Sequence, residues 1–470
     1  MRIFTVLLVA VTVWVSPVLA QTTRPAKPNI IVLLADDLGS YDVGWRGSEI
    51  KTPNLDRLAN GGVKLEAFYV QPICSPTRAA FMTGRYPFRY GQQNVVRPWA
   101  KTGVDLTERF LPQALKDAGY ETAIAGKWHL GHQAPGYLPM QRGFDHQYGV
   151  LNGAMDYFTH ERDGGLDWHR DDKALVEEGY STTLIGKESA RLIKTRDKSK
   201  PLFLYVPFNG VHAPFQAPES YKAPYTQFKA VRRTYAGMTT AVDDEVGRIM
   251  ATVREEGIEG NTLIFFASDN GGPDPGRITS NGPLRGGKFT IWEGGVRTCA
   301  FFNWPGVLPA GGHVDTPMHI VDLFATFVGL AGGKTDGSKP LDSRDVWPAL
   351  TGKVPSIHDV IPLNLLPRGG AIRSGEWKLV VNGGGRLGDE GDDGADGDAQ
   401  VDGSDARAAS KYALFNLASD PSEKTNVAAE NPKVVEELAA KYAKLQKDVR
   451  PSPATPKPKN YQAPKVWGEF

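Results

Sequence analysis

The stretch 71–85 places one of only two cysteines in the chain among turn-forming and basic residues. Cys74 is followed by Ser75, Pro76 and, four residues on, Arg78. A cysteine kept for packing usually has apolar neighbours, whereas cationic surroundings favour chemistry at the sulfur or at the group that replaces it. The local spacing leaves two interpretations equally open: a side chain used in chemistry, or a half-buried cysteine at the start of a helix.

Two acidic clusters each follow a continuous apolar run of strand length. Asp36 and Asp37 come after the first run, and Asp269 and Asn270 come after the second. Because the carboxyl ends of parallel strands meet at one edge of a sheet, these side chains are expected to lie close together. Three carboxylates and an amide oxygen form a hard-oxygen site for Ca²⁺ or Mg²⁺. Taken singly, either pair could instead be a helix cap or a turn.

Basic and imidazole side chains occupy further strand ends and adjoining loops. Lys127, Lys288 and Arg78 suit a bound tetrahedral oxyanion. His129 and His212 could transfer protons near neutral pH, although a single histidine more often serves only as a hydrogen-bonding residue. Together the clusters indicate a site where a metal ion, an oxyanion and proton-transfer groups meet.

A repeating order of strand, polar cluster and helix would bring these residues together. Strands are expected at 29–35, 121–125, 202–206 and 262–267, and helices near 75–83, 106–119, 181–195, 231–256 and 319–331. This alternation predicts an α/β fold with a large, mostly parallel sheet flanked by helices. The loops 90–105 and 145–175 are expected to form the walls of a substrate pocket.

The chain changes character near residue 355. The segments 371–381 and 412–417 alternate like strands of an antiparallel hairpin, and 432–449 is an amphipathic helix. We therefore predict a catalytic domain over 21–355 and a smaller C-terminal domain over 356–470. The Gly- and Asp-rich insertion 383–410 lacks the ordered spacing of a calcium loop, which favours a flexible surface segment.

The N-terminal residues 1–20 have a positive start, a short apolar run and small residues at the end. This pattern predicts a secretory signal and an exported, periplasmic or secreted protein; a membrane anchor is the alternative, but the apolar run is short for a bilayer span. The two cysteines, Cys74 and Cys299, allow at most one disulfide. A net charge of +1 indicates no global attraction to nucleic acid or to an anionic membrane.

Two motifs carry a resemblance to a known family. Residues 74–85, CSPTRAAFMTGR, resemble the signature of type I sulfatases, Cys-x-Pro-x-Arg followed by a Thr-Gly-Arg ending, and residues 126–131, GKWHLG, match the second signature of that family. The resemblance runs from about residue 28 to 426 and implies an alkaline-phosphatase-like fold with a mixed, mostly parallel sheet. Within the family, the segments around 71, 142–145 and 156–162 look most like the arylsulfatase B group, the N-acetylgalactosamine-4-sulfatases.

The resemblance implies that Cys74 is converted to Cα-formylglycine by a maturation enzyme, and that the hydrated aldehyde is the nucleophile. The metal, Ca²⁺ or alternatively Mg²⁺, would be held together with residue 74 by Asp36, Asp37, Asp269 and Asn270. These expectations explain why the thiol needs no disulfide partner.

The resemblance also implies a role for each remaining site residue. Arg78 would orient the hydrate and favour its ionised form, and Lys127 and Lys288 would bind the sulfate oxygens. His212 would help to protonate the leaving sugar oxygen. His129 would then take a proton from the second hydroxyl of the hydrate, which expels sulfate.

The expected function is hydrolysis of a sulfate ester on a carbohydrate, with a 4-O-sulfated galactose or N-acetylgalactosamine unit as the expected substrate. One alternative is a phosphonate or phosphate monoester hydrolase on the same fold, and the other is a sulfated-glycan-binding protein in which Cys74 is never converted. The expected partners are the saccharide and the maturation enzyme, with no nucleic acid and no membrane span.

Overall fold

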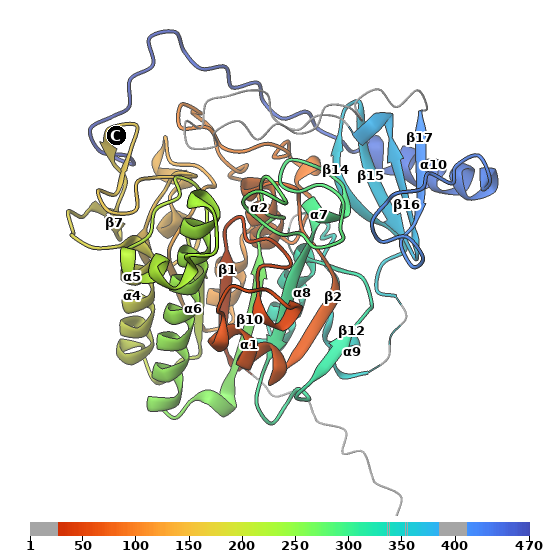
Figure 1. Cartoon of the computed structure of the whole chain (residues 1–470). Coiled ribbons are helices and arrows are strands. Elements are labelled where there is room, and N and C mark those ends of the chain that lie inside the picture. Colours follow the sequence, from red (N-terminus) through yellow and green to blue (C-terminus); the bar gives the residue numbers. More distant parts are fainter. Residues whose placement is uncertain (1–26, 336, 338, 353, 355, 385–410) are drawn as a thin grey trace, which may run out of the picture.

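The computed structural model describes residues 27–470 apart from 336, 338, 353, 355 and 385–410. The predicted secretory signal and nearly all of the predicted insertion 383–410 lie outside the described residues and stay predictions. Figure 1 shows a large sheet flanked by helices, with a small antiparallel sheet beside it.

The large sheet is mixed and mostly parallel in its centre. Its order is β12-β2-β11-β10-β1-β9-β3-β4-β7-β8, with β13 also paired to β2. Its strands are β1 (Asn29–Ala35), β2 (Val63–Tyr69), β3 (Glu121–Ala125), β4 (His146–Gly149), β7 (His169–Arg170), β8 (Lys173–Ala174), β9 (Leu202–Pro207), β10 (Thr262–Ser268), β11 (Arg297–Asn303), β12 (Gly312–Val314) and β13 (Met318–His319). The central strands β10, β1, β9, β3 and β4 pair in parallel, whereas β11 runs antiparallel to both β10 and β2.

Helices cover both faces of this sheet. In the larger part of the chain they are α1 (Pro53–Asn60), α2 (Cys74–Thr83), α3 (Leu111–Asp117), α4 (Ser181–Thr195), α5 (Glu219–Lys222), α6 (Ala230–Glu255), α7 (Glu293–Val296), α8 (Leu323–Leu330) and α9 (Trp347–Thr351), whereas α10 (Pro432–Gln446) packs on the small antiparallel sheet. Alternation along β1 divides the core: Ile30, Val32 and Leu34 pack with residues of α2, α3 and α8, while Ile31 and Leu33 pack with residues of α1, α4 and α6. A strand buried on both faces explains the continuous apolar run in the sequence.

The C-terminal part forms a second, four-stranded antiparallel sheet in the order β14-β15-β16-β17. Its strands are β14 (Ile361–Leu366), β15 (Gly369–Ser374), β16 (Trp377–Val381) and β17 (Tyr412–Asn416), and a separate hairpin pairs β5 (Glu161–Arg162) with β6 (Gly165–Leu166). Buried Lys378 of β16 joins the two parts of the chain, because its ammonium lies 3.1 Å from Glu293 and 2.7 Å from Glu423. The boundary predicted near residue 355 itself stays a prediction.

The predicted fold class is confirmed, with some differences in the elements. The predicted hairpin over 371–381 and 412–417 is part of four strands, since β15 and β16 are separated by a turn at Gly375. The helix predicted over 319–331 is shorter, because a 3₁₀ turn (Ile320–Asp322), capped by His319, precedes α8. Both cysteines are buried and free. Across the described ranges, we find no helix with the length and apolar character needed to span a membrane.

Candidate active site

Four oxygen-bearing side chains meet at the carboxyl ends of β1 and β10. These strands pair in parallel with their last residues opposite each other, which places Asp36 and Asp37 beside Asp269 and Asn270. The Asn270 side-chain amide donates to Asp37 Oδ1 at 2.7 Å, and the Asp37 backbone amide donates to Asp269 Oδ1 at 3.2 Å. All four residues are buried. The acidic pairs are therefore not isolated caps or turns but parts of one cluster.

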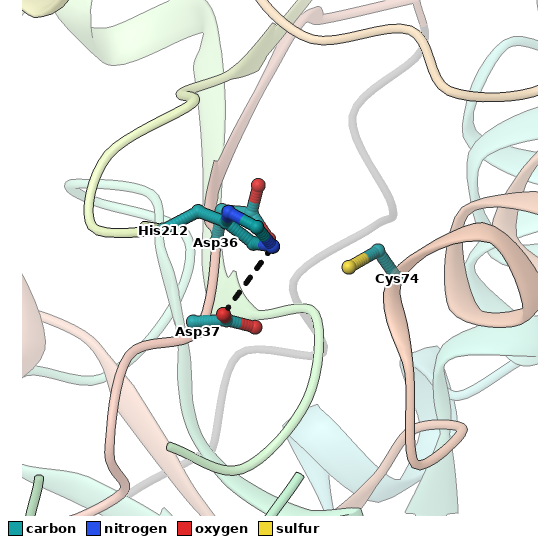
Figure 2. A group of neighbouring side chains, drawn as sticks. All are labelled: Asp36, Asp37, Cys74 and His212. Carbon is teal, nitrogen blue, oxygen red and sulfur yellow. Dashed lines mark ion pairs between the residues drawn. The ribbon is translucent and has the colours of Figure 1, made fainter. Parts of the chain in front are cut away.

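Cys74 faces this cluster from the opposite side, as the first residue of α2. Figure 2 shows its thiol pointing toward Asp36, Asp37 and His212. One ligand atom from each of these four side chains lies within 4.8 Å of the others. Every residue of α2 is buried, so the helix holds Cys74 firmly in the protein interior.

Two lysines lie against the aspartates. Lys127 Nζ is 2.5 Å from Asp36 Oδ2, and Lys288 Nζ is 2.9 Å from Asp37 Oδ2. Lys127 follows β3 through Gly126, where φ is +138° and a Cβ atom would lie 1.9 Å from the carbonyl oxygen of Pro207. Only glycine permits this close approach, which explains the first residue of the GKWHLG motif.

Arg78 lies one turn along α2 from Cys74 and is fully buried. Its Nε and Nη2 donate to Asp269 Oδ2 at 3.0 and 2.8 Å, and its Nη1 donates to the Lys127 carbonyl at 2.9 Å. A guanidinium with several fixed donors can connect these groups, whereas an ammonium could not reach them all. Arg78 thus links the start of α2 to the ends of β10 and β3.

The hydrogen bonds of His212 show which ring nitrogen carries the proton and which accepts. Its Nδ1 lies 2.5 Å from the Ala213 carbonyl, which can only accept, so Nδ1 carries the proton. Its Nε2 lies 3.0 Å from Lys288 Nζ and accepts from that ammonium. The Tyr157 hydroxyl contacts the His212 carbonyl at 2.7 Å, which holds the backbone of this loop in place.

His129 has the opposite arrangement. Its Nε2 donates to the Val96 carbonyl at 3.1 Å, and its buried Nδ1 has no hydrogen-bond partner among the described residues. Burial, together with the charges of Lys127 and Arg78, lowers the pKa of His129 well below its ordinary value. The ring is therefore neutral, with a lone pair on Nδ1 that can accept a proton. Gly153 packs against this ring and leaves no room for a side chain, since a Cβ there would lie 2.4 Å from it.

The electrostatics of the cluster shift the pKa values of Asp36 and Asp269 in opposite directions. Burial opposes ionisation of Asp36, but the charges of Lys127, Arg78 and Lys288 outweigh it and bring its pKa below the ordinary value. Burial and the neighbouring Asp36 carboxylate raise the pKa of Asp269. A cation between these oxygens would favour the ionised form of both.

Burial also decides the state of the Cys74 thiol. It raises the pKa of Cys74 well above the ordinary value, despite the nearby lysines. The sulfur is therefore protonated near neutral pH and is a weak nucleophile.

The residues present fit a divalent cation with a preference for oxygen ligands. Asp36 Oδ1 and Asn270 Oδ1 are both buried and have no hydrogen-bond partner within the described part of the chain. Unsatisfied buried oxygens are costly unless a cation or water satisfies them. The carboxylates of Asp37 and Asp269 complete a set of hard ligands of the kind that Ca²⁺ and Mg²⁺ prefer.

A narrow cleft leads from the protein surface to this cluster. It is lined by Ile73, Cys74, Val95, Val96, Pro98, His129, Gly153, Ala154, Arg162, His212, Lys288 and Phe289. The structure thus brings all the sequence-predicted site residues to one buried edge of the sheet or to the cleft above it. It adds Arg162, which lies within the loop predicted as a wall, and Val96, for which the sequence carries no chemical signal.

Comparisons with known proteins agree with this geometry. A family model described as Sulfatase matches residues 28–333, which is more than half of the chain. Arylsulfatase J of Mus musculus is 35% identical over 96% of this chain and 81% of its own length. The chain belongs to the sulfatase family. Family membership makes it a sulfuric ester hydrolase.

Other sulfatases resemble this one over most of the chain. N-acetylgalactosamine-6-sulfatase of Sus scrofa is 36% identical over 71% of this sulfatase and 67% of that protein. The crystal structure of Ps i-CgsB in complex with k-i-k-neocarrahexaose is 32% identical, with a TM-score of 0.79 over 90% of this chain and 94% of that one. The predicted fold and family are therefore confirmed.

Proposed function

We propose that this sulfatase releases sulfate from a sulfated saccharide, using a divalent cation and a formylglycine made from Cys74. The observation that supports the proposal most directly is the buried group of Cys74, Asp36, Asp37 and His212, whose ligand atoms lie within 4.8 Å of one another. Lysines lie against both aspartates. This arrangement suits attack at the sulfur of a sulfate ester, because negative charge spreads onto oxygens that already face fixed cations.

The binding of sulfate is assigned to Lys127 and Lys288. Both ammonium groups are buried and directed toward the same edge of the sheet, and Arg78 adds a third cation beside residue 74. A bound ion would be held by Asp36, Asp37, Asp269 and Asn270, together with residue 74, and would supply electrostatic stabilisation of the sulfate oxygens. We propose Ca²⁺, with Mg²⁺ as the alternative.

Formylglycine, made from Cys74 by a maturation enzyme, would supply a hydrated aldehyde with one hydroxyl for attack and a second whose deprotonation releases sulfate. His212 is assigned to protonate the leaving sugar oxygen in its doubly protonated form: Nδ1–H stays on the Ala213 carbonyl, and Nε2, which faces the cleft, carries the proton that is donated in place of the hydrogen bond it accepts from Lys288. His129 is placed to accept a proton, because its neutral ring holds a free lone pair at Nδ1. The two histidines thus divide the acid and base roles.

A sulfated galactose or N-acetylgalactosamine unit is the proposed substrate class. Among the relatives, proteins from several mammals are named N-acetylgalactosamine-6-sulfatase, and one related structure contains k-i-k-neocarrahexaose. The 4-O position expected from the arylsulfatase B likeness has less support than the sugar class, because the named hexosamine relatives are 6-sulfatases. The position is best decided by measurement.

The experiment is a screen of defined saccharides that carry a single 4-O- or 6-O-sulfate, with aryl sulfate and aryl phosphate as reference substrates. Sulfate release is measured with protein from a host that converts such cysteines, and the mass of the peptide containing residue 74 is determined. Release of sulfate from a saccharide, with formylglycine at 74, supports the proposal. Faster hydrolysis of aryl phosphate would favour the phosphate monoester hydrolase. Unmodified Cys74 without turnover would favour a glycan-binding protein.

Removal of the metal provides an independent test. Chelation should lower both the activity and the thermal midpoint, because three neighbouring carboxylates then repel one another, and Ca²⁺ should restore both. The Asp37→Asn variant should weaken Ca²⁺ binding by roughly tenfold or more in a calorimetric titration. Asp117→Asn, at an exposed carboxylate, is the matched control and should bind like the wild type. Equal affinities for the two variants would contradict the proposed ion site.

A further inference from the structure

An open groove lies next to the cleft, between the loop 90–106 and the C-terminal segment (residues 451–470). We call it the outer groove. Its lining consists of Tyr90, Gly91, Gln92, Asn94, Val95, Val96, Arg97, Trp99, Ala100, Thr102, Gly103, Asp105, Leu106, Tyr137 and residues 452–457. Val95 and Val96 also line the cleft, so the two depressions are adjacent and share one wall.

The C-terminal segment forms the far wall of the outer groove. Figure 1 shows it running from the side of α10 across the top of the molecule to the loops near β7. The Trp99 indole N–H donates to the Thr455 carbonyl at 2.7 Å, and the Gln93 backbone amide donates to Ser452 Oγ at 3.0 Å. These bonds join Ser452 and Thr455 of the groove-lining segment to the loop opposite.

Further anchoring comes from the end of the segment. Trp467 is only 1% exposed, and its indole N–H donates to the Arg162 carbonyl at 3.0 Å. Its backbone amide donates to Leu166, and its carbonyl accepts from His169 at 2.7 Å. The segment is thus fixed to both loops that surround the cleft, and the groove has two defined walls.

The chemistry of the lining matches a sulfated sugar chain. The Lys457 ammonium lies 5.2 Å from the centre of the Trp99 ring, and Arg97 adds a second cation. The one acidic side chain in the described lining, Asp105, already accepts from the amide and hydroxyl of Thr107. Aromatic side chains pack against sugar rings, amides form hydrogen bonds with hydroxyl groups, and cations pair with sulfates. A groove that carries all three kinds of side chain fits a sulfated saccharide better than a purely apolar partner.

We propose that the outer groove binds further sugar units of a sulfated saccharide whose reacting unit occupies the cleft. This inference rests on the proposed function and deepens it, because it makes an oligosaccharide or polysaccharide the preferred substrate. The shared wall at Val95 and Val96 places the two depressions side by side, within reach of one saccharide chain. Lys457 contributes to affinity for the chain and has no contact with the reacting sulfate.

The test compares two lengths of one substrate, a sulfated carrageenan hexasaccharide and the disaccharide of the same repeat. The wild type should show a higher kcat/KM on the hexasaccharide. Lys457→Gln should reduce that value by roughly three- to tenfold, the effect of losing one favourable cation, and leave the value for the disaccharide unchanged. Lys457→Arg should retain the preference. Lys459→Gln, at an exposed lysine of the same segment outside the lining, is the matched control.

Binding to the inactive Cys74→Ala protein separates this inference from the proposed function. Calorimetry should show tighter binding of the hexasaccharide than of the disaccharide, and Lys457→Gln in the same background should remove the difference. Equal affinities for the two lengths, or equal losses in the Lys457→Gln and Lys459→Gln proteins, would overturn the inference. Length-dependent binding by protein that releases no sulfate from any saccharide would support the groove and contradict the proposed function.

Discussion

At the scale of residues, burial changes the interpretation of the role of Cys74. The sequence context left a reactive thiol and a packing residue equally open. In the structure the thiol is buried and its pKa is raised by that burial, yet it faces two aspartates and a histidine. A simple packing role does not account for this position, whereas the proposed conversion of Cys74 to formylglycine would account for it.

Replacement of Cys74 by alanine tests that interpretation. The variant should lose activity by roughly a thousandfold or more, because it removes the precursor of the nucleophile. Its free energy of unfolding should change by only about 1–2 kcal/mol, since a small buried group is lost. Sulfate release and urea unfolding measure the two effects. A Cys74→Ala protein with substantial activity would show that residue 74 is not the origin of the nucleophile.

Replacement of His212 by alanine tests the assignment of the leaving-group acid. A sugar alcohol is a poor leaving group without a proton, whereas a phenol with electron-withdrawing groups departs readily. His212→Ala should therefore reduce kcat on a sulfated sugar by roughly 10²–10⁴-fold and reduce it much less on an activated aryl sulfate. Equal reductions on the two substrates would indicate that His212 positions Lys288 instead of donating a proton.

At the scale of elements, Glu188 of α4 holds a helix against the edge of the large sheet. Its carboxylate accepts from His146 of β4 at 2.9 Å, from Arg170 of β7 at 2.7 Å and from Arg191 at 2.7 Å. Burial alone would raise its pKa, but the bonds from His146 and Arg191 outweigh burial and lower it to about 2. The loop that contributes Gly153, Ala154 and Arg162 to the cleft connects β4 to β7.

The lowered pKa predicts a defined pH dependence of stability. The folded state favours the ionised form of Glu188, so its contribution is fully present above the ordinary value of 4.5 and is lost as the pH falls toward 2. The free energy of unfolding of the wild type should fall between pH 5 and pH 3. In the Glu188→Gln variant this fall should be smaller by about 1–2 kcal/mol, with allowance for solvent screening. Urea unfolding at several pH values measures this slope. Glu255→Gln, in an exposed pair with Lys194, is the control and should keep the wild-type slope.

At the scale of the whole molecule, the C-terminal segment connects regions that are far apart in the sequence. It leaves α10 beside the small sheet and ends against the loops next to β7 (Figure 1). The buried Trp467 is its main anchor, with its ring edge-on to His132 at a centroid distance of 5.3 Å. The outer groove therefore depends on residues that are far apart in the sequence, 90–106 and 452–457.

The Trp467→Ala variant should destabilise the protein by roughly 3–5 kcal/mol, as expected for loss of a large buried aromatic side chain. It should also increase hydrogen exchange throughout residues 451–470, because the segment loses its anchor. The control is Phe470→Ala, at an aromatic residue of the same segment that is 68% exposed, which should change stability by less than about 0.5 kcal/mol. Unchanged exchange in the Trp467→Ala protein would show that the hydrogen bonds to the loop 90–106 suffice.

The sequence alone predicted the class of the fold, which is confirmed, and a set of site residues that the structure brings close together. Apolar runs that end in Asp36, Asp37, Asp269 and Asn270 specify buried strands with polar ends, and the local motif around Cys74 specifies a helix start. These patterns can be recognised in the sequence because they depend only on residues that are close together along the chain. They also depend on resemblance, since spacing alone did not distinguish a chemical role for Cys74 from a packing role.

Only the tertiary structure decided the state of those groups and the shape of the surface around them. Whether Cys74 is protonated and which nitrogen of His129 is free depend on burial and on partners distant in the chain, which local sequence does not encode. The contact between Trp99 and the segment 452–457 joins residues more than 350 positions apart. Such contacts follow from packing of the complete chain, and for that reason the outer groove has no signature in the sequence.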